Sequence, residues 1–223
     1  MSARRPNRRE VAAAETRREI LLAARRLFAE NGFANTSVQQ IAEASGVAVQ
    51  TIYSSVGSKS ALVLALNELI DQEAGVADLA RDLLEETDPS ALIAKGVHLT
   101  RQLNERCGDI IRVLLSAEPA EPEAAAVVAD GMRRHERGAS AMAQRLGALG
   151  ALRADTTPEQ AAAVLSMMTS PASWRQLTQG AGWTFDEGQQ WLTTSLALLL
   201  LGSGGGPMTA RGDASASMAR TRR

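Results

Sequence analysis

The chain has 223 residues and is 45% hydrophobic but only 3% aromatic. Alanine and leucine dominate the apolar residues, which favours helices over strands. With a formal net charge of −1, a single cysteine and no apolar run longer than six residues, the composition argues against a disulfide-stabilised domain and against a membrane-spanning segment.

Charge is divided unevenly along the chain. Residues 1–60 carry nine Lys or Arg against five Asp or Glu, whereas the rest carries 15 basic and 20 acidic residues. This asymmetry favours a polyanionic partner for the N-terminal part alone, with a solvated charged face as the alternative. Residues 1–14 are basic and lack apolar periodicity, so we expect a flexible arm there.

Residues 15–60 are predicted to form a helix-turn-helix domain. Helical spacing of apolar residues predicts a first helix over about 15–31. Thr36 or Ser37 can cap a second helix, and Gly46 gives the backbone freedom that a tight turn needs. A short third helix follows over about 48–55, and Ser58 can cap a fourth. A helix-turn-helix places its second helix in the major groove of DNA, so this layout predicts a DNA partner.

Several side chains of this segment are suited to contact DNA. Gln50 can pair with an adenine edge, and the Tyr53 hydroxyl can bind a phosphate. Lys59 stands in the first turn of a helix, where a cation is unfavourable unless a phosphate shares the site. The free amides at the start of the second helix form an anion site. The predicted DNA-binding residues are Thr36, Ser37, Val49, Gln50, Thr51, Tyr53 and Lys59.

The span from Thr16 to about Leu66 resembles the DNA-binding head of the TetR family of bacterial repressors. The matching motifs are LFAENGFANTSV, IAEASGV, TIY and SKSAL. The resemblance implies that Thr36, Gln50, Thr51, Tyr53 and Lys59 lie near DNA. Family members often carry Ser at position 48, an aromatic residue or His at 55 and Phe at 56. This chain has Ala48, Ser55 and Val56, which weakens one cap and puts Ser55 as a DNA contact in doubt.

Residues 61–202 are predicted to form an all-helical body of about six helices, and residues 203–223 a disordered tail. We expect Gly75 to kink or divide the fourth helix. The later helices are expected over 89–106, 108–117, 122–149, 158–170 and 186–201, with a short helix and loop over 171–182. The body resembles the TetR family in length and helical layout. Its stretch TSPASWRQLTQGAGWTFDEGQQWL is similar to one common class of the family's C-terminal domains.

The resemblance implies that the body holds a ligand pocket and a dimer surface. The last helix is apolar nearly all round, which indicates core, an interface or both, with a monomeric core as the alternative. The predicted interface residues are Val164, Met168, Trp191 and Leu198. Soft or flat apolar side chains suit a hydrophobic ligand, so the predicted pocket residues are Met132, Met142, Met167 and Trp174.

The sequence predicts a homodimeric, ligand-responsive repressor that a small hydrophobic molecule releases from a near-palindromic DNA operator. It contains no P-loop, GxSxG or HExxH motif and no ligand-spaced cluster, so we expect no catalytic residue, cofactor or metal. We expect a cytoplasmic protein with no membrane partner. The alternatives are a ligand-independent or activating DNA-binding regulator and a helical small-molecule-binding scaffold that no longer reads DNA.

Overall fold

The computed structural model describes residues 7–74, 81–83 and 85–202. Within these ranges the regular structure is helical, apart from one isolated antiparallel bridge between Leu152 and Leu201. The elements are α1 (Arg8–Asn31), α2 (Val38–Ser45), α3 (Val49–Ser55), α4 (Lys59–Ala74), α6 (Pro89–Ala117), α7 (Pro122–Ala148), α8 (Pro158–Met168), α9 (Pro171–Arg175), the π-helical turn η1 (Gln176–Gly180) and α10 (Phe185–Leu200). The all-α prediction, with a helix-turn-helix head and a helical body, is confirmed.

Helix α1 begins seven residues earlier than the sequence predicted. The Asn7 side chain accepts a hydrogen bond from the Glu10 amide, and the Glu10 carboxylate accepts one from the Asn7 amide at 2.8 Å. This capping box satisfies two donors that a helix start leaves open, so residues 8–14 are helical and not part of an arm. The rest of the predicted arm, residues 1–6, lies outside the described residues.

The turn of the helix-turn-helix follows from local sequence. Ser37 caps α2 and forms a reciprocal capping box with Gln40. Gly46 ends α2 in the left-handed region, with φ of 69°, where a side chain would be strained. Ile41 and Ile52 point inward from α2 and α3 and are completely buried. The turn and this shared apolar contact fix the angle between the two helices.

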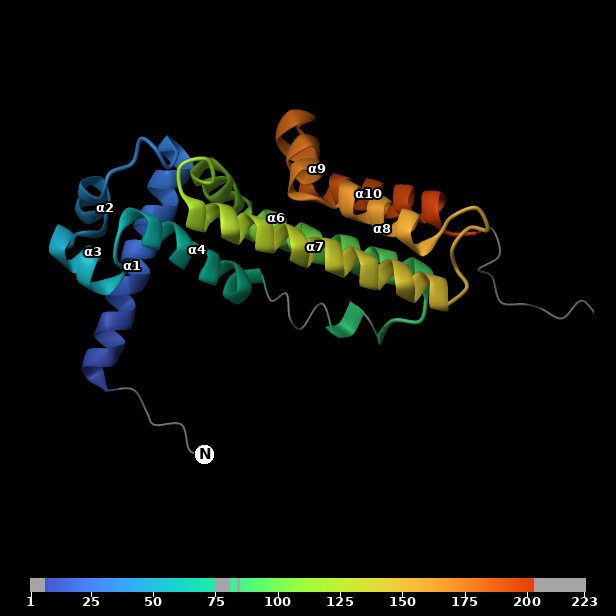
Figure 1. Ribbon diagram of the computed structural model, residues 1–223, viewed down its shortest axis with the longest axis horizontal. Coiled ribbons are helices and arrows are strands. Elements are labelled where there is room, and N and C mark those ends of the chain that lie inside the picture. The colour runs from blue at the N-terminus through green and yellow to red at the C-terminus, as the bar shows by residue number, and fades with distance from the viewer. Residues whose placement is uncertain (1–6, 75–80, 84, 203–223) are drawn as a thin grey trace, which may run out of the picture.

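The body is an antiparallel pair of long helices covered on one side. Helices α6 and α7 run side by side, α8 and α10 lie along them, and α9 stands up from this layer (Figure 1). Helix α6 is continuous through Gly108, where the sequence predicted two helices. Cys107 and Ile110 on either side are completely buried, so tertiary packing outweighs the low helix propensity of one glycine. The predictions of a kink at Gly75 and a disordered tail over 203–223 lie outside the described residues.

The head and the body share one apolar core. A single cluster joins Ile20 and Phe28 of α1 with Ile52 of α3, Leu62 of α4 and Ile110 of α6. Burying each of these side chains contributes roughly 1.5–3 kcal/mol. A second cluster lies within the body, around Trp174, Leu165 and Leu196. The head is therefore packed onto α6, and a shift of α6 reaches α1 through direct contact. In the described ranges no helix is both long and apolar enough to cross a membrane.

Candidate nucleic-acid interface

Helix α3 presents a polar outer face. Ile52 is completely buried and anchors the helix to the head, while Gln50, Tyr53 and Ser54 are exposed. Half of the Tyr53 side chain, 51%, is open to solvent. An exposed tyrosine and glutamine on a short helix held by one apolar residue leave the phenol and amide free to meet base edges and phosphates.

The other two predicted residues of α3 are less open. Val49 is half-buried and packs against the head core, and Thr51 is also half-buried. Ala48 stands at the N-cap of α3 and makes no side-chain cap bond, as the departure at that position predicted. The start of α3 therefore rests on packing by Val49 and on the preceding turn.

Thr36 and Ser37 have different roles. Ser37 is exposed, and its Oγ accepts a hydrogen bond from the Gln40 amide at 3.1 Å. Thr36 is buried, with 2% of its surface exposed, and its hydroxyl lies 2.9 Å from the Gly32 carbonyl and 3.1 Å from the Leu27 carbonyl. Thr36 thus holds the loop between α1 and α2. The capping box uses the amides of Ser37 and Gln40, so the amides of Val38 and Gln39 are the first-turn donors that could meet an anion.

Lys59 is the first residue of α4, and its ammonium lies over the ring of Phe33. Its Nζ lies 4.2 Å from the centre of the Phe33 ring, a cation–π distance, and the Phe33 side chain is buried. Burial lowers the pKa of the Lys59 ammonium, and the Glu121 carboxylate acts in the opposite direction. The ring orients the lysine, and a phosphate beside it would stabilise the charged form.

Sequence reasoning missed Arg17. Its Nη1 donates to the Ser55 carbonyl at 2.9 Å, and its Nη2 lies 3.5 Å from the Glu68 carboxylate of α4. The arginine therefore satisfies an open carbonyl at the end of α3 and links α1, α3 and α4. Ser55 itself is half-buried. The contact spans 38 residues, so no local pattern indicated it.

Arg25 and Ser60 join the head to the body through polar contacts. The Arg25 guanidinium of α1 donates to both carboxylate oxygens of Asp109 on α6, at 2.5 and 2.8 Å. The Ser60 hydroxyl of α4 donates to the Glu121 carboxylate before α7 at 2.7 Å. Each contact joins a head helix to the body, so the position of α3 depends on the body.

The comparisons with known proteins agree with this geometry. Residues 20–66 match the family model described as bacterial regulatory proteins, tetR family. The chain carries a tetR-family head. A comparison with curated proteins found no match.

Solved structures of transcriptional regulators share the fold along most of the chain. A putative regulator from Saccharomonospora viridis in complex with choline has a TM-score of 0.68 and 21% identity, over 84% of this chain and 98% of that one. FadR from Bacillus subtilis in complex with stearoyl-CoA has a TM-score of 0.65 and 16% identity, over 82% of this chain and 98% of that one. SmeT, the repressor of the Stenotrophomonas maltophilia multidrug efflux pump SmeDEF, has a TM-score of 0.65 and 18% identity, over 90% of this chain and 97% of that one.

The predicted pocket residues of the body lie in different environments. Met132 and Met167 are exposed at 61% and 64%, and Met142 is buried in the body core, where its sulfur abuts Gly96. Of these four residues, Trp174 lines a cavity of about 480 Å³. A pocket built from Met132, Met142, Met167 and Trp174 together stays a prediction, because helical periodicity does not fix which helix face meets a cavity. Among the described residues, no three His, Cys, Asp or Glu side chains gather as a metal site requires.

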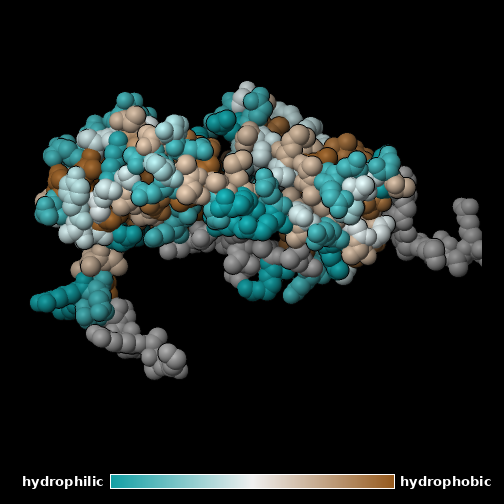
Figure 2. Space-filling model, in the orientation of Figure 1, coloured by the Kyte–Doolittle hydropathy of each residue, from teal (hydrophilic) through white to brown (hydrophobic). Residues whose placement is uncertain are grey.

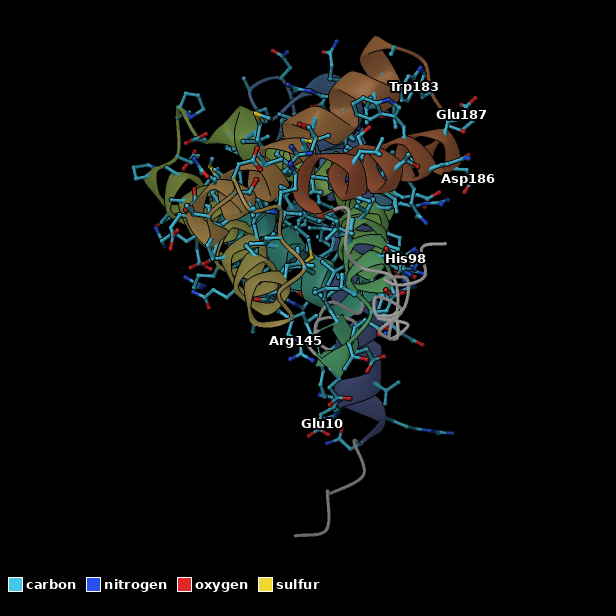
Figure 3. The ribbon with its side chains drawn as sticks, turned by 90° about the vertical axis from the view of Figure 1, so that its right-hand side faces the viewer. Glu10, His98, Arg145, Trp183, Asp186 and Glu187 are labelled. Atoms are coloured by element: carbon cyan, nitrogen blue, oxygen red, sulfur yellow. The ribbon has the colours of Figure 1, made fainter. Side chains whose placement is uncertain are left out.

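The predicted interface residues lie on α8 and α10. Leu198 and Trp191 of α10 are exposed at 72% and 46%, and Val164 and Met168 of α8 are half-buried. Hydrophobic colour gathers over the C-terminal part of α10 (Figure 2). Trp191 packs edge-on against Trp183, which lies at the start of α10 beside Asp186 and Glu187 (Figure 3). Leu199, at 53% exposure, extends this surface beyond the predicted residues.

Proposed function

We propose that the protein is a homodimeric transcriptional repressor that binds a near-palindromic DNA operator and leaves it when a small molecule binds the body. The observation that carries the proposal is the outer face of α3, where Gln50 and Tyr53 are exposed opposite the buried Ile52. This face belongs to a head that matches the tetR family model. The proposed DNA contacts are Ser37, Val49, Gln50, Thr51, Tyr53 and Lys59. Thr36 supports them indirectly, because its hydroxyl holds the loop before α2 in place.

Dimerisation through α8 and α10 completes the proposed repressor. A monomer that exposes Leu198, Leu199 and Trp191 on one helix leaves a contiguous apolar surface in water. A two-fold pairing of such helices would bury it in a self-complementary way. Two heads related by that axis would reach half-sites roughly 34–36 Å apart, which is one turn of DNA.

Release requires that the body changes the spacing of the heads. Arg25, Ser60 and the shared core tie the head to α6 and α7, so a ligand that moves α6 would shift α3 relative to its half-site. A few kcal/mol of preference for one arrangement is enough to change occupancy strongly. Choline and stearoyl-CoA are bound by two relatives of the same fold, which supports a ligand site in the body. The proposal includes no catalytic step and places the protein in the cytoplasm with its operator.

Selection from random duplex DNA tests the proposal. Full-length protein is mixed with a random library at a stated salt concentration, and bound duplexes are sequenced over several rounds. Enrichment of an inverted repeat is the expected result. Binding that depends on salt but enriches no sequence would contradict operator recognition.

A further inference from the structure

A cavity lies at the junction of the head and the body. It has a volume of about 480 Å³ and is walled by α1, α6, α9, η1 and the start of α10. The space-filling surface is notched at this place, between the head and the peak formed by α9 (Figure 2). Its apolar wall consists of Ile111, Leu115, Pro171, Trp174 and Phe185.

The charged wall of this junction cavity carries more cations than anions. Four arginines line it, Arg25, Arg106, Arg112 and Arg175, against the two carboxylates Glu105 and Asp109. Both carboxylates are already engaged, because Asp109 accepts from Arg25 and Glu105 lies 3.0 Å from Arg101, which is outside the lining.

Two of these arginines keep their charge available. Within the described part of the chain, neither Arg112 nor Arg175 forms an ion pair, and both side chains are exposed. A guanidinium is always charged near neutral pH and offers a planar fork of donors that matches a carboxylate or phosphate. The cavity therefore joins an apolar wall to a rim with unneutralised positive charge.

We propose that the junction cavity binds an organic anion with an apolar body, such as an arylalkyl or alkyl carboxylate. The apolar body packs against Trp174 and Phe185, which lie 5.7 Å apart between ring centres. The anionic group pairs with Arg112 and Arg175 and approaches Arg25. At Arg25 it competes with Asp109, so the protein's own carboxylate acts as an internal competitor for the ligand.

This site deepens the proposed function, and its regulatory meaning rests on that function. Arg25 belongs to the head, and its Nη2 also donates to the Arg106 carbonyl of α6 at 2.6 Å. An anion that draws Arg25 away from Asp109 loosens a direct bond between α1 and α6. Such a ligand has different contacts in the two arrangements, which is what a shift of equilibrium requires.

Calorimetric titration of the full-length protein with two matched probes tests the site without DNA. The probes are 4-phenylbutyrate and its neutral amide, 4-phenylbutyramide. We expect the acid to bind about tenfold or more tightly than the amide, because hydrogen bonds to charged groups are stronger than neutral ones. Equal affinities, or no saturable binding of the acid or of decanoate as a second anion, would overturn the proposal.

Variants then locate the site. R112A combined with R175A should weaken 4-phenylbutyrate binding by about tenfold or more, whereas R137A, which removes an exposed arginine on α7, should not. D109N should tighten binding severalfold, since it removes the charge of the internal competitor while keeping the side-chain shape. Melting temperatures of all variants are compared with the parent protein. Unchanged affinity in the double arginine variant, or weaker binding in a folded D109N, would overturn the assignment. Because no readout uses DNA, loss of operator binding would contradict the proposed function and leave this result standing.

Discussion

The Arg25 guanidinium of α1 and the Asp109 carboxylate of α6, 84 residues apart in the chain, form a two-pronged ion pair at the junction of head and body. Their side chains are only 18% and 27% exposed, so solvent screens the pair weakly. Partial burial alone would raise the pKa of Asp109, but the hydrogen bonds and charge of Arg25 outweigh it, and the pKa of Asp109 lies below its usual value.

Removing one member of this pair should destabilise the fold. R25A leaves a half-buried carboxylate without its cation and should lower the free energy of unfolding by about 1–3 kcal/mol. D109N should cost less, because the amide still accepts from the guanidinium. Urea denaturation of each variant and of the double variant gives the coupling energy. Additive effects of the two substitutions would show that the pair is energetically silent.

Tyr53 and Lys59 are predicted to contact phosphates. Y53F removes one hydroxyl and K59A one charge, so both should weaken binding to every DNA sequence alike. K59A should also reduce the slope of log affinity against log salt by about 1. Fluorescence anisotropy on a selected operator and on a scrambled duplex measures both quantities. Wild-type affinity in both variants would remove these residues from the interface.

Gln50 is predicted to read a base. Q50A should relax the preference at one position in each half-site, with a cost of about 1–3 kcal/mol on the preferred base and little change on the others. Binding to operators with each base at that position separates readout from general affinity. S54A, on the same exposed face of α3, is the matched comparison. A uniform loss across all four bases would argue that Gln50 contacts only the backbone.

Leu198 is predicted to lie at the centre of the dimer surface. L198E would place two buried charges on the two-fold axis, so the dissociation constant of the dimer should rise by about 100-fold or more. Light scattering after gel filtration over a concentration series measures it. L22E, which adds the same charge at a part-exposed leucine of α1, should leave the dimer intact. A dimer that survives L198E would move the interface elsewhere.

Glu86, which lies just before α6, has a strongly lowered pKa. Its carboxylate lies 2.7 Å from the Lys95 ammonium and accepts from the Thr87 and Asp88 amides. The Lys95 hydrogen bond and then these amides lower the pKa of Glu86 to about 2. Because the folded value lies below the ordinary 4.5, the stabilisation is fully present above pH 4.5 and is lost as pH falls through about 2.

The Glu86 titration can be followed directly. In K95A the carboxyl midpoint should rise toward 4.5, as measured by the carbon chemical shift of the side chain. Glu187 belongs to the capping box of α10, away from Lys95 (Figure 3). Its carboxyl midpoint should therefore not change in K95A. Arg145 donates a hydrogen bond to the backbone carbonyl of Glu86, so it does not contact the carboxylate that titrates. An unmoved Glu86 midpoint would assign its low pKa to the loop amides alone.

Local signals predicted the head well. The cap at Ser37, the left-handed Gly46 and the apolar spacing of α1 each depend on neighbours within a few residues, so the sequence displays them directly. The start of α1 was missed although Asn7 and Glu10 form the same kind of box. Residues 1–14 lack the apolar periodicity that indicates a helix, so the cap had no helical pattern beside it.

Contacts distant in sequence could not be predicted in the same way. Thr36 is a residue type that often caps helices at the surface, yet it is buried and its hydroxyl donates to the Leu27 carbonyl of α1. Arg25 is one of the nine basic residues of the N-terminal part, yet it pairs with Asp109 on α6. Met132 and Met167 are as apolar as Met142, but only Met142 lies on a helix face that packs into the body core, where it meets Gly96 of α6. These differences arise from the faces that helices turn toward each other.

Footprinting of the full-length protein on its selected operator tests the central claim most directly. Hydroxyl-radical cleavage at fixed salt reports which sugars the protein covers. The account predicts two symmetric protected patches on one face of the duplex, centred roughly 34–36 Å apart, both lost when L198E separates the two heads. A single patch, or uniform protection without symmetry, would contradict a dimer that reads two half-sites through α3.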